Sequence, residues 1–211
     1  MRVLGIDTSS EACSVALVDE RAETPEQRLL GADTRVLGRG HAEALLPMIA
    51  ALPDKGRADR IIVGLGPGSF TGVRIAIATA RALGIAWGAH VLGYQTLQLL
   101  ARSAAREAEP LLVCMNGGHG EWFVQAFDAH CAPLAPVRSM RPEQAAAHFD
   151  QLHIIGSKAE EFVALRGSGH ALSRLPDARH AVDLPESDLT STLSPIYGRA
   201  PDATPQKATS A

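Results

Sequence analysis

The acidic and hydroxyl side chains near the N-terminus are the first that could take part in chemistry. Asp7, Thr8 and Ser9 follow a short apolar segment that predicts a buried strand, residues 2–7. A carboxylate at the end of such a strand can meet a metal-bound nucleotide, so these three residues are candidate cofactor contacts. The turn contains no glycine, however, whereas phosphate loops use glycine so that backbone amides approach the oxygen atoms closely. A functional loop and a turn stabilised by its own Asp and Ser side chains therefore stand as equal alternatives.

A second candidate is the glycine-rich segment at residues 64–72, Gly-Leu-Gly-Pro-Gly-Ser-Phe-Thr-Gly. Ser69 stands where a dinucleotide fingerprint requires its third glycine, and the Gly-Lys-Ser/Thr ending of a P-loop is absent. Pro67 and Thr71 also take the places of the glycines in a nucleophile elbow. A structural turn from a strand into a helix is the favoured interpretation. Ser69 or Thr71 would cap that helix, and its N-terminal amides could receive an anion, which makes Ser69 a further candidate contact.

The histidines and cysteines show no spacing typical of metal ligands. None of the eight histidines belongs to a His-x-x-x-His or His-Glu-x-x-His pair, and the three cysteines lie far apart, as expected of buried thiols. His119, within the glycine-rich link at residues 116–120 and close to Glu121, is the best single candidate for a site, although a plain loop residue is favoured. No Ser/His/Asp arrangement follows from the spacing.

Composition excludes several classes of protein. The formal charge is −3, with no run of Lys or Arg, which disfavours nucleic-acid binding by this chain alone. Aromatic residues make up 4% of the chain, so no stacking platform for single strands is expected. No apolar run reaches membrane-spanning length, and the N-terminus does not have the pattern of a signal peptide. We therefore expect a cytoplasmic protein without a membrane partner.

The elements that position these residues form two groups. In residues 1–108 the pattern predicts strands at 2–7, 13–19, 28–36, 61–64 and 91–92, and helices at 41–52, 71–87 and 95–106. Pro47 lies inside the first helical pattern, so that helix either begins near Ala44 or is kinked. The order β-β-β-α-β-α-β-α predicts an α/β lobe and excludes a plain Rossmann domain, which would begin β-α-β.

The remaining chain predicts a second, smaller lobe at residues 109–198. Strands are expected at 111–115, 121–127 and 153–156, and helices at 142–149 and 158–165. The pattern weakens after Arg166, and the Pro/Thr/Ala/Ser composition of residues 199–211 predicts a disordered tail. The helix predicted at 71–87 is apolar nearly all round, so it must be buried on more than one side.

Three ordered motifs resemble the TsaB (YeaZ) family, subunits of the bacterial machinery that makes threonylcarbamoyladenosine in tRNA. They are Val3–Ser9, His41–Ile49 and Gly66–Ile75, and a fainter match lies at residues 195–203. The resemblance implies an actin-like (ASKHA, ribonuclease H-like) ATPase fold of two related lobes, the second reduced. It also implies a paralogous partner, TsaD, which transfers the threonylcarbamoyl group to the adenosine beside the anticodon. The ATPase TsaE would be a third component of the complex, tRNA would be met only through the complex, and the chain alone would form a homodimer.

The resemblance further implies a non-catalytic subunit that binds and activates TsaD. TsaD carries a metal-binding histidine pair after the strand that follows its own Gly-Pro-Gly helix, whereas residues 93–99 here contain no histidine. No cofactor of its own is expected, with ATP, Mg²⁺ and the metal held by the partner subunits. In the family, the two helices of the first lobe form the partner surface. The contacts expected on them are Leu45, Leu46, Met48, Ile49, Val73, Arg74, Ile77 and Arg81.

The alternative function is that of a small ATPase or sugar-kinase-like phosphotransferase on the same fold, suggested by Asp7 and its turn. Such enzymes need glycine-rich phosphate loops and a catalytic carboxylate in the opposite lobe, and neither is evident. A peptidase has still less support, because there is neither a zinc pair nor a nucleophile elbow. Residues 116–120 also depart from the Asp-Ala-Arg-type segment that family members often carry before Glu-Val-Tyr.

Overall fold

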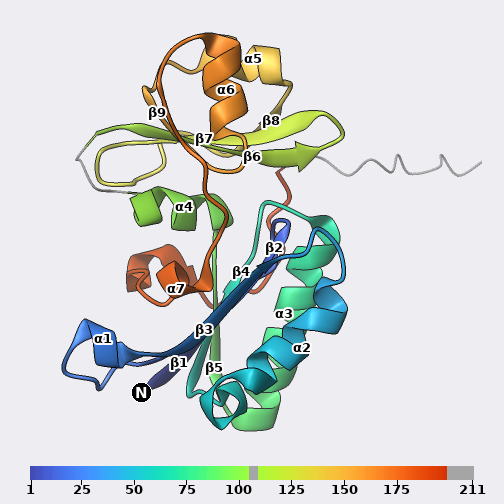
Figure 1. The fold of residues 1–211 in the computed structure, drawn as a ribbon, viewed down its shortest axis with the longest axis vertical. Helices are drawn as coiled ribbons and strands as arrows, with labels where there is room; N and C mark the ends of the chain where they lie inside the picture. The colour runs from blue at the N-terminus through green and yellow to red at the C-terminus, as the bar shows by residue number, and fades with distance from the viewer. Residues whose placement is uncertain (105–108, 199–211) are drawn as a thin grey trace, which may run out of the picture.

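The first of two β-sheets is mixed and has six strands. The computed structural model describes residues 1–104 and 109–198, and their two sheets define two lobes (Figure 1). The central strand, β1, pairs antiparallel with β2 and parallel with β4, as the predicted element order requires. The strand order is β11-β5-β4-β1-β2-β3. The bounds are β1 Arg2–Asp7, β2 Ala12–Asp19, β3 Leu29–Val36, β4 Arg60–Gly64, β5 His90–Tyr94 and β11 Leu189–Thr190.

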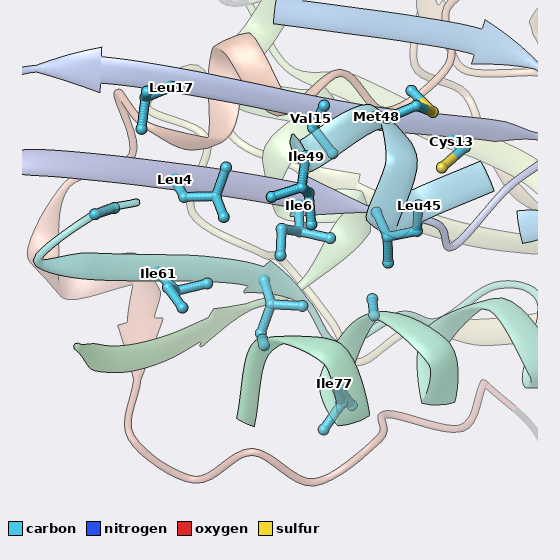
Figure 2. Packing of buried hydrophobic residues seen from close by; sticks show 14 of the residues in the cluster. Leu4, Ile6, Cys13, Val15, Leu17, Leu45, Met48, Ile49, Ile61 and Ile77 are labelled. Atoms are coloured by element: carbon cyan, nitrogen blue, oxygen red, sulfur yellow. The ribbon is translucent and has the colours of Figure 1, made fainter. Parts of the chain in front are cut away.

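One face of this sheet is covered by two helices that lie side by side, α2 (His41–Ala51) and α3 (Phe70–Trp87). Figure 2 shows the packing: Leu45 of α2 and Ile77 of α3 share one apolar cluster with strand residues such as Ile6. The α2 helix begins at His41 and continues through Pro47, whose ring is exposed, so a start near Ala44 is excluded. The first lobe also has two short helices, α1 (Pro25–Arg28) and η1 (Pro53–Gly56).

The opposite face of the first sheet is covered by α4 (Thr96–Ala104) and by α7 (Ala178–Ala181) from the far end of the chain. A Cβ atom on Gly5 would lie 2.8 Å from the Ala178 carbonyl oxygen, so glycine is what permits α7 to lie on β1. The assignment of all of residues 109–198 to the second lobe is therefore wrong for α7 and β11, which complete the first. The cause is tertiary: these elements are too short to show a periodic pattern. The one-turn helix η2 (Glu186–Asp188) lies between them.

The second sheet has the order β10-β9-β6-β7-β8. One face packs against α5 and α6, and the other against α4 (Figure 1). The expected strands and helices of this lobe are confirmed, whereas the short strands β8 and β10 were not predicted. The bounds are β6 Leu111–Gly118, β7 Glu121–Phe127, β8 Arg138–Met140, β9 His153–Ile155, β10 His170–Leu172, α5 Pro142–His148 and α6 Ala159–Arg166.

The two lobes repeat one order of elements. The series β1-β2-β3-α2-β4-α3-β5-α4 corresponds to β6-β7-β8-α5-β9-α6-β10-α7, with the same antiparallel and parallel pairings. The last helix of each series crosses over: α4 contacts β6 and β9, whereas α7 contacts β1 and β2. The predicted two-lobe α/β fold with a reduced second lobe is confirmed. Among the helices of the described residues, none combines the length and apolar character needed to cross a membrane.

Candidate functional site

The turn between β1 and β2 lies in direct contact with the segment that begins α3. The Ser69 amide donates a hydrogen bond to the Ser9 carbonyl (2.7 Å), and the Thr8 hydroxyl donates to the Gly72 carbonyl (2.7 Å). A Cβ atom on Gly68 or Gly72 would lie 2.0 or 1.9 Å from the backbone oxygens of this turn. Glycine is required here so that two backbone segments can touch. The structural interpretation of the glycine-rich segment is supported, with Ser69 as the helix cap, since its Oγ accepts from the Gly72 amide.

The Asp7 carboxylate points into the protein, where its side chain is only 1% exposed. One of its oxygen atoms accepts hydrogen bonds from the Ser9 amide (2.8 Å) and hydroxyl (2.6 Å), and the other accepts from the Tyr94 hydroxyl (2.6 Å). Burial raises the pKa of Asp7, against the lowering effect of these hydrogen bonds. Burial likewise raises the pKa of Tyr94 well above 10. One carboxylate oxygen thus joins the end of β1 to Tyr94 at the end of β5, and the other holds the turn that follows β1.

A cavity of about 790 Å³ lies between the lobes. Two of the four predicted cofactor contacts, Ser9 and Ser69, line it, whereas Asp7 and Thr8 do not. His119 lines it as well, on the hairpin between β6 and β7 that forms the opposite wall. Within residues 1–104 and 109–198, no three His, Cys, Asp or Glu side chains gather closely enough to hold a metal ion.

The predicted partner contacts on α2 and α3 divide into two groups. Five of them are nearly inaccessible to solvent because they fasten the two helices to the first sheet: Leu45, Met48, Ile49, Val73 and Ile77. Their assignment to a partner surface is corrected, because a side chain that fills the core cannot contact a docked protein. The error arose from choosing large apolar residues, and those residues mark the sheet-facing side of each helix. Leu46, Arg74 and Arg81 are exposed.

The outer side of the same two helices is apolar yet exposed. Leu46 is 53% exposed and Ile85 is 88% exposed. Exposed alanines lie four residues before and after Leu46, at Ala42 and Ala50, and at Ala78 and Ala82 of α3. We call this surface the helix-pair face and define it as Ala42, Leu46, Ala50, Ala78, Ala82 and Ile85. Sequence reasoning missed five of its six residues, although small or apolar residues recur every four positions at 42, 46 and 50 and at 78 and 82.

The two arginines of α3 bind a segment of their own chain. Arg81 donates to the Leu193 carbonyl (2.8 Å) and Arg74 donates to the Tyr197 hydroxyl (2.8 Å). The Ile196 amide also donates to the Leu65 carbonyl (2.7 Å). Residues 191–198, which we call the C-terminal strap, therefore run along one side of α3 and leave the helix-pair face uncovered.

Comparison with known proteins places the chain among related sequences. A family model described as TsaD, tRNA N6-adenosine threonylcarbamoyltransferase, matches residues 27–156. The tRNA threonylcarbamoyladenosine biosynthesis protein TsaB of Escherichia coli is 35% identical over 128 residues, which is 57% of this chain and 52% of the relative. The TsaB protein of Haemophilus influenzae is 35% identical over 130 residues, 57% of this chain and 51% of the relative. The matched region thus spans about half the length of these curated relatives.

Two solved structures from Pseudomonas aeruginosa share the fold over most of the chain. The first, described as an uncharacterized protein with similarity to peptidase YEAZ, has a TM-score of 0.76 and 30% identity, covering 94% of this chain and 99% of its own. The second, described as YeaZ, has a TM-score of 0.73 and 28% identity, covering 93% and 99%. The similarity therefore includes the second lobe, for which the sequence motifs are faint.

Proposed function

Because the chain belongs to the TsaB (YeaZ) family, which is paralogous to TsaD, we propose that it takes part in threonylcarbamoyladenosine modification of tRNA. Its role is that of a non-catalytic subunit that binds a TsaD partner and activates it. TsaE joins as a third component, and tRNA is met only through the complex, in the cytoplasm. The chain alone pairs with a second copy of itself.

The observation that carries the proposal is the helix-pair face. Leu46 and Ile85 leave apolar side chains in water, and the neighbouring alanines keep the surface flat. Small side chains let the helices of another protein approach closely, and covering Leu46 and Ile85 would recover hydrophobic free energy. A paralogue with a similar helix pair would form a compact four-helix contact there.

The surroundings of Asp7 support a subunit without catalysis of its own. Its two oxygen atoms are engaged by Ser9 and Tyr94, and the side chain does not line the inter-lobe cavity. The alternative of a small ATPase or phosphotransferase needs a carboxylate that faces bound nucleotide and metal. The stretch at residues 93–99, which lacks histidine, supports the same proposal.

Size-exclusion chromatography with the TsaD protein of the same organism tests the contact. The wild-type chain should co-elute with TsaD at micromolar concentrations, and Ile85→Asp should elute separately, because a carboxylate would be buried in an apolar contact. Leu134→Asp is the matched control, since Leu134 is an exposed apolar residue of the second lobe. Co-elution should survive that change. Two independent peaks for the wild-type proteins would refute the partner.

Reconstituted tRNA modification tests the activating role. Product formation by TsaD and TsaE should fall strongly when this chain is omitted or replaced by Ile85→Asp, and should be restored by Leu134→Asp. Unchanged product on omission would refute activation.

A further inference from the structure

We propose that the C-terminal strap fixes the angle between the two lobes, and that Phe70, Arg74 and Tyr197 form the latch that holds the strap in place. The strap joins the lobes beside the inter-lobe cavity, whereas α4 joins them at a separate place. This device does not depend on the proposed partner, because none of the three latch residues belongs to the helix-pair face.

The strap is anchored first to the first lobe. Leu193 and Ile196 pack against the apolar core of that lobe. The Ile196 amide donates to the Leu65 carbonyl, and a Cβ atom on Gly66 would lie 3.0 Å from the Ile196 carbonyl oxygen. Glycine at position 66 therefore lets the strap lie directly on the segment that joins β4 to α3.

The latch residues hold Tyr197 against the first turns of α3. The Nη2 atom of Arg74 donates to the Tyr197 hydroxyl (2.8 Å), and its guanidinium carbon lies 3.3 Å from the centre of the Phe70 ring. The ring centroids of Phe70 and Tyr197 are 5.7 Å apart. No ion pair between Arg74 and a carboxylate occurs in the described residues. The guanidinium group therefore interacts with the two aromatic side chains and not with a competing acid.

The residue after Tyr197 contacts the second lobe. A Cβ atom on Gly198 would lie 2.3 Å from the Cε1 atom of Phe123, so the strap lies directly against a side chain of β7. Phe123 is only 5% exposed and belongs to the apolar cluster between α4 and the second sheet. Ile196, Tyr197 and Gly198 also line the inter-lobe cavity, together with Phe123. The strap therefore reaches from one lobe to the other beside this cavity.

Hydrogen bonds from α4 connect the lobes at the separate place. Gln98 donates to the Cys131 carbonyl (2.7 Å), and Arg102 donates to the His130 carbonyl (3.0 Å). None of these four residues lines the cavity, whereas the strap does. Limited interfaces between domains ordinarily allow relative motion. Two attachments at separate places remove that freedom, and release of the strap leaves the lobes free to turn about α4.

Distances between spin labels on the two lobes test the latch in the full chain. Labels at Glu43→Cys on α2 and Glu160→Cys on α6 report the angle, because both positions are exposed and the three native cysteines are buried. Double electron–electron resonance should give one narrow distance distribution when the strap is intact. Tyr197→Ala should broaden it about twofold or more, because the lobes then turn about α4. A distribution that is broad with the intact strap, or equally narrow in Tyr197→Ala, would overturn the proposal.

Two further variants act on separate parts of the device. Arg74→Gln should broaden the distribution as Tyr197→Ala does, because it removes the guanidinium group that holds the tyrosine. Gly198→Val should shift the mean distance, because a side chain at this position does not fit against Phe123. An unchanged distribution in both variants would refute the latch.

Arg81→Gln is the matched control within the strap. It removes the hydrogen bond to the Leu193 carbonyl, which precedes the Ile196 anchor, so the distribution should stay narrow. Broadening equal to that of Tyr197→Ala would contradict the assignment of the latch to Phe70, Arg74 and Tyr197. Ile85→Asp should also leave the distribution unchanged even though it loses the TsaD partner, so failure of one proposal is distinguishable from failure of the other.

Discussion

The first and second lobes build the same series of elements to different lengths, and the difference lies in the helices. In the first lobe α2 and α3 have 11 and 18 residues, whereas the corresponding α5 and α6 have 7 and 8. Both pairs expose charged residues, but only the long pair has exposed alanines grouped with Leu46 and Ile85. A helix of two turns therefore suffices to cover a sheet of this kind. The added length of α3 provides a surface that the fold itself does not use.

The largest expected effect distinguishes the two sides of α2. Leu45→Ala should lower the free energy of unfolding by about 2–5 kcal/mol, because Leu45 is fully buried against the first sheet. The adjacent change, Leu46→Ala, should alter it by less than about 0.5 kcal/mol, because Leu46 faces solvent. Urea denaturation of both variants measures the difference. Similar losses for the two would contradict the assignment of the faces.

The next prediction concerns the turns before α3 and α6. In each turn a glycine lies directly against the backbone of a neighbouring segment. Gly68→Ala should cost about 1–3 kcal/mol, because its Cβ atom would lie 2.0 Å from the Ser9 carbonyl oxygen. Gly156→Ala should cost at least as much, since its Cβ atom would lie 2.3 Å from the Cys114 carbonyl oxygen and its φ is +124°. Denaturant titration checks both. A negligible loss at either position would show that this close approach can relax.

A smaller effect is the pH dependence of folding stability, which should have opposite signs for the buried Asp7 and the partly buried Asp177. Burial raises the pKa of Asp7 above its ordinary value of 3.8, so the folded state keeps this proton to higher pH than the unfolded state. The contribution of Asp7 to stability is therefore full below the ordinary pKa and is lost as pH rises through the folded pKa. Asp7→Asn should gain stability relative to the wild type as pH rises from about 4 to 7. Urea unfolding at several pH values measures this trend.

Asp177, which caps α7, provides the control with the opposite sign. Burial raises the pKa of Asp177, but the hydrogen bonds from Arg179 lower it by a larger amount, so the net shift is downward. Its contribution to stability is present above the ordinary pKa and is lost as pH falls through the folded pKa. The stability deficit of Asp177→Asn should therefore shrink in acid. A difference that does not vary with pH in the Asp7→Asn series would contradict the shift assigned to Asp7.

The smallest expected effect compares exposed apolar residues on α3 and α6. Ile85→Ala and Leu165→Ala should each change the free energy of unfolding by less than about 0.5 kcal/mol, because both side chains are exposed. Only Ile85→Ala should weaken the proposed contact with TsaD in a pull-down titration. A weaker contact with Leu165→Ala would place the second lobe in the interface.

The sequence predicted those parts of the fold in which pattern and burial coincide. Ile61, Ile62 and Val63 form an unbroken apolar run because both faces of β4 are covered, and they were assigned correctly. By contrast, β11 has two residues and joins the first sheet only through the tertiary fold. No local pattern indicates such a strand.

The candidate sites were harder to predict for a related reason. The composition of α3 is the same on two sides: Ala76 and Ala80 face the sheet, whereas Ala78 and Ala82 face solvent. The sequence alone therefore does not separate core from surface on this helix. Likewise, no spacing rule brings Tyr197 against Phe70, because that contact depends on the C-terminal strap crossing the molecule.

The exchange of the last helices has a consequence for synthesis on the ribosome. When residues 1–104 have emerged, Leu97 and Leu100 of α4 still lack the second sheet against which they pack. That face of the first sheet also lacks α7 and β11, which follow all the elements of the second lobe in the chain. Each lobe therefore needs a helix from the other half of the chain to cover its sheet. The nascent chain must therefore keep apolar surface exposed until α7 and β11 have also emerged, and the two lobes then fold as one cooperative unit.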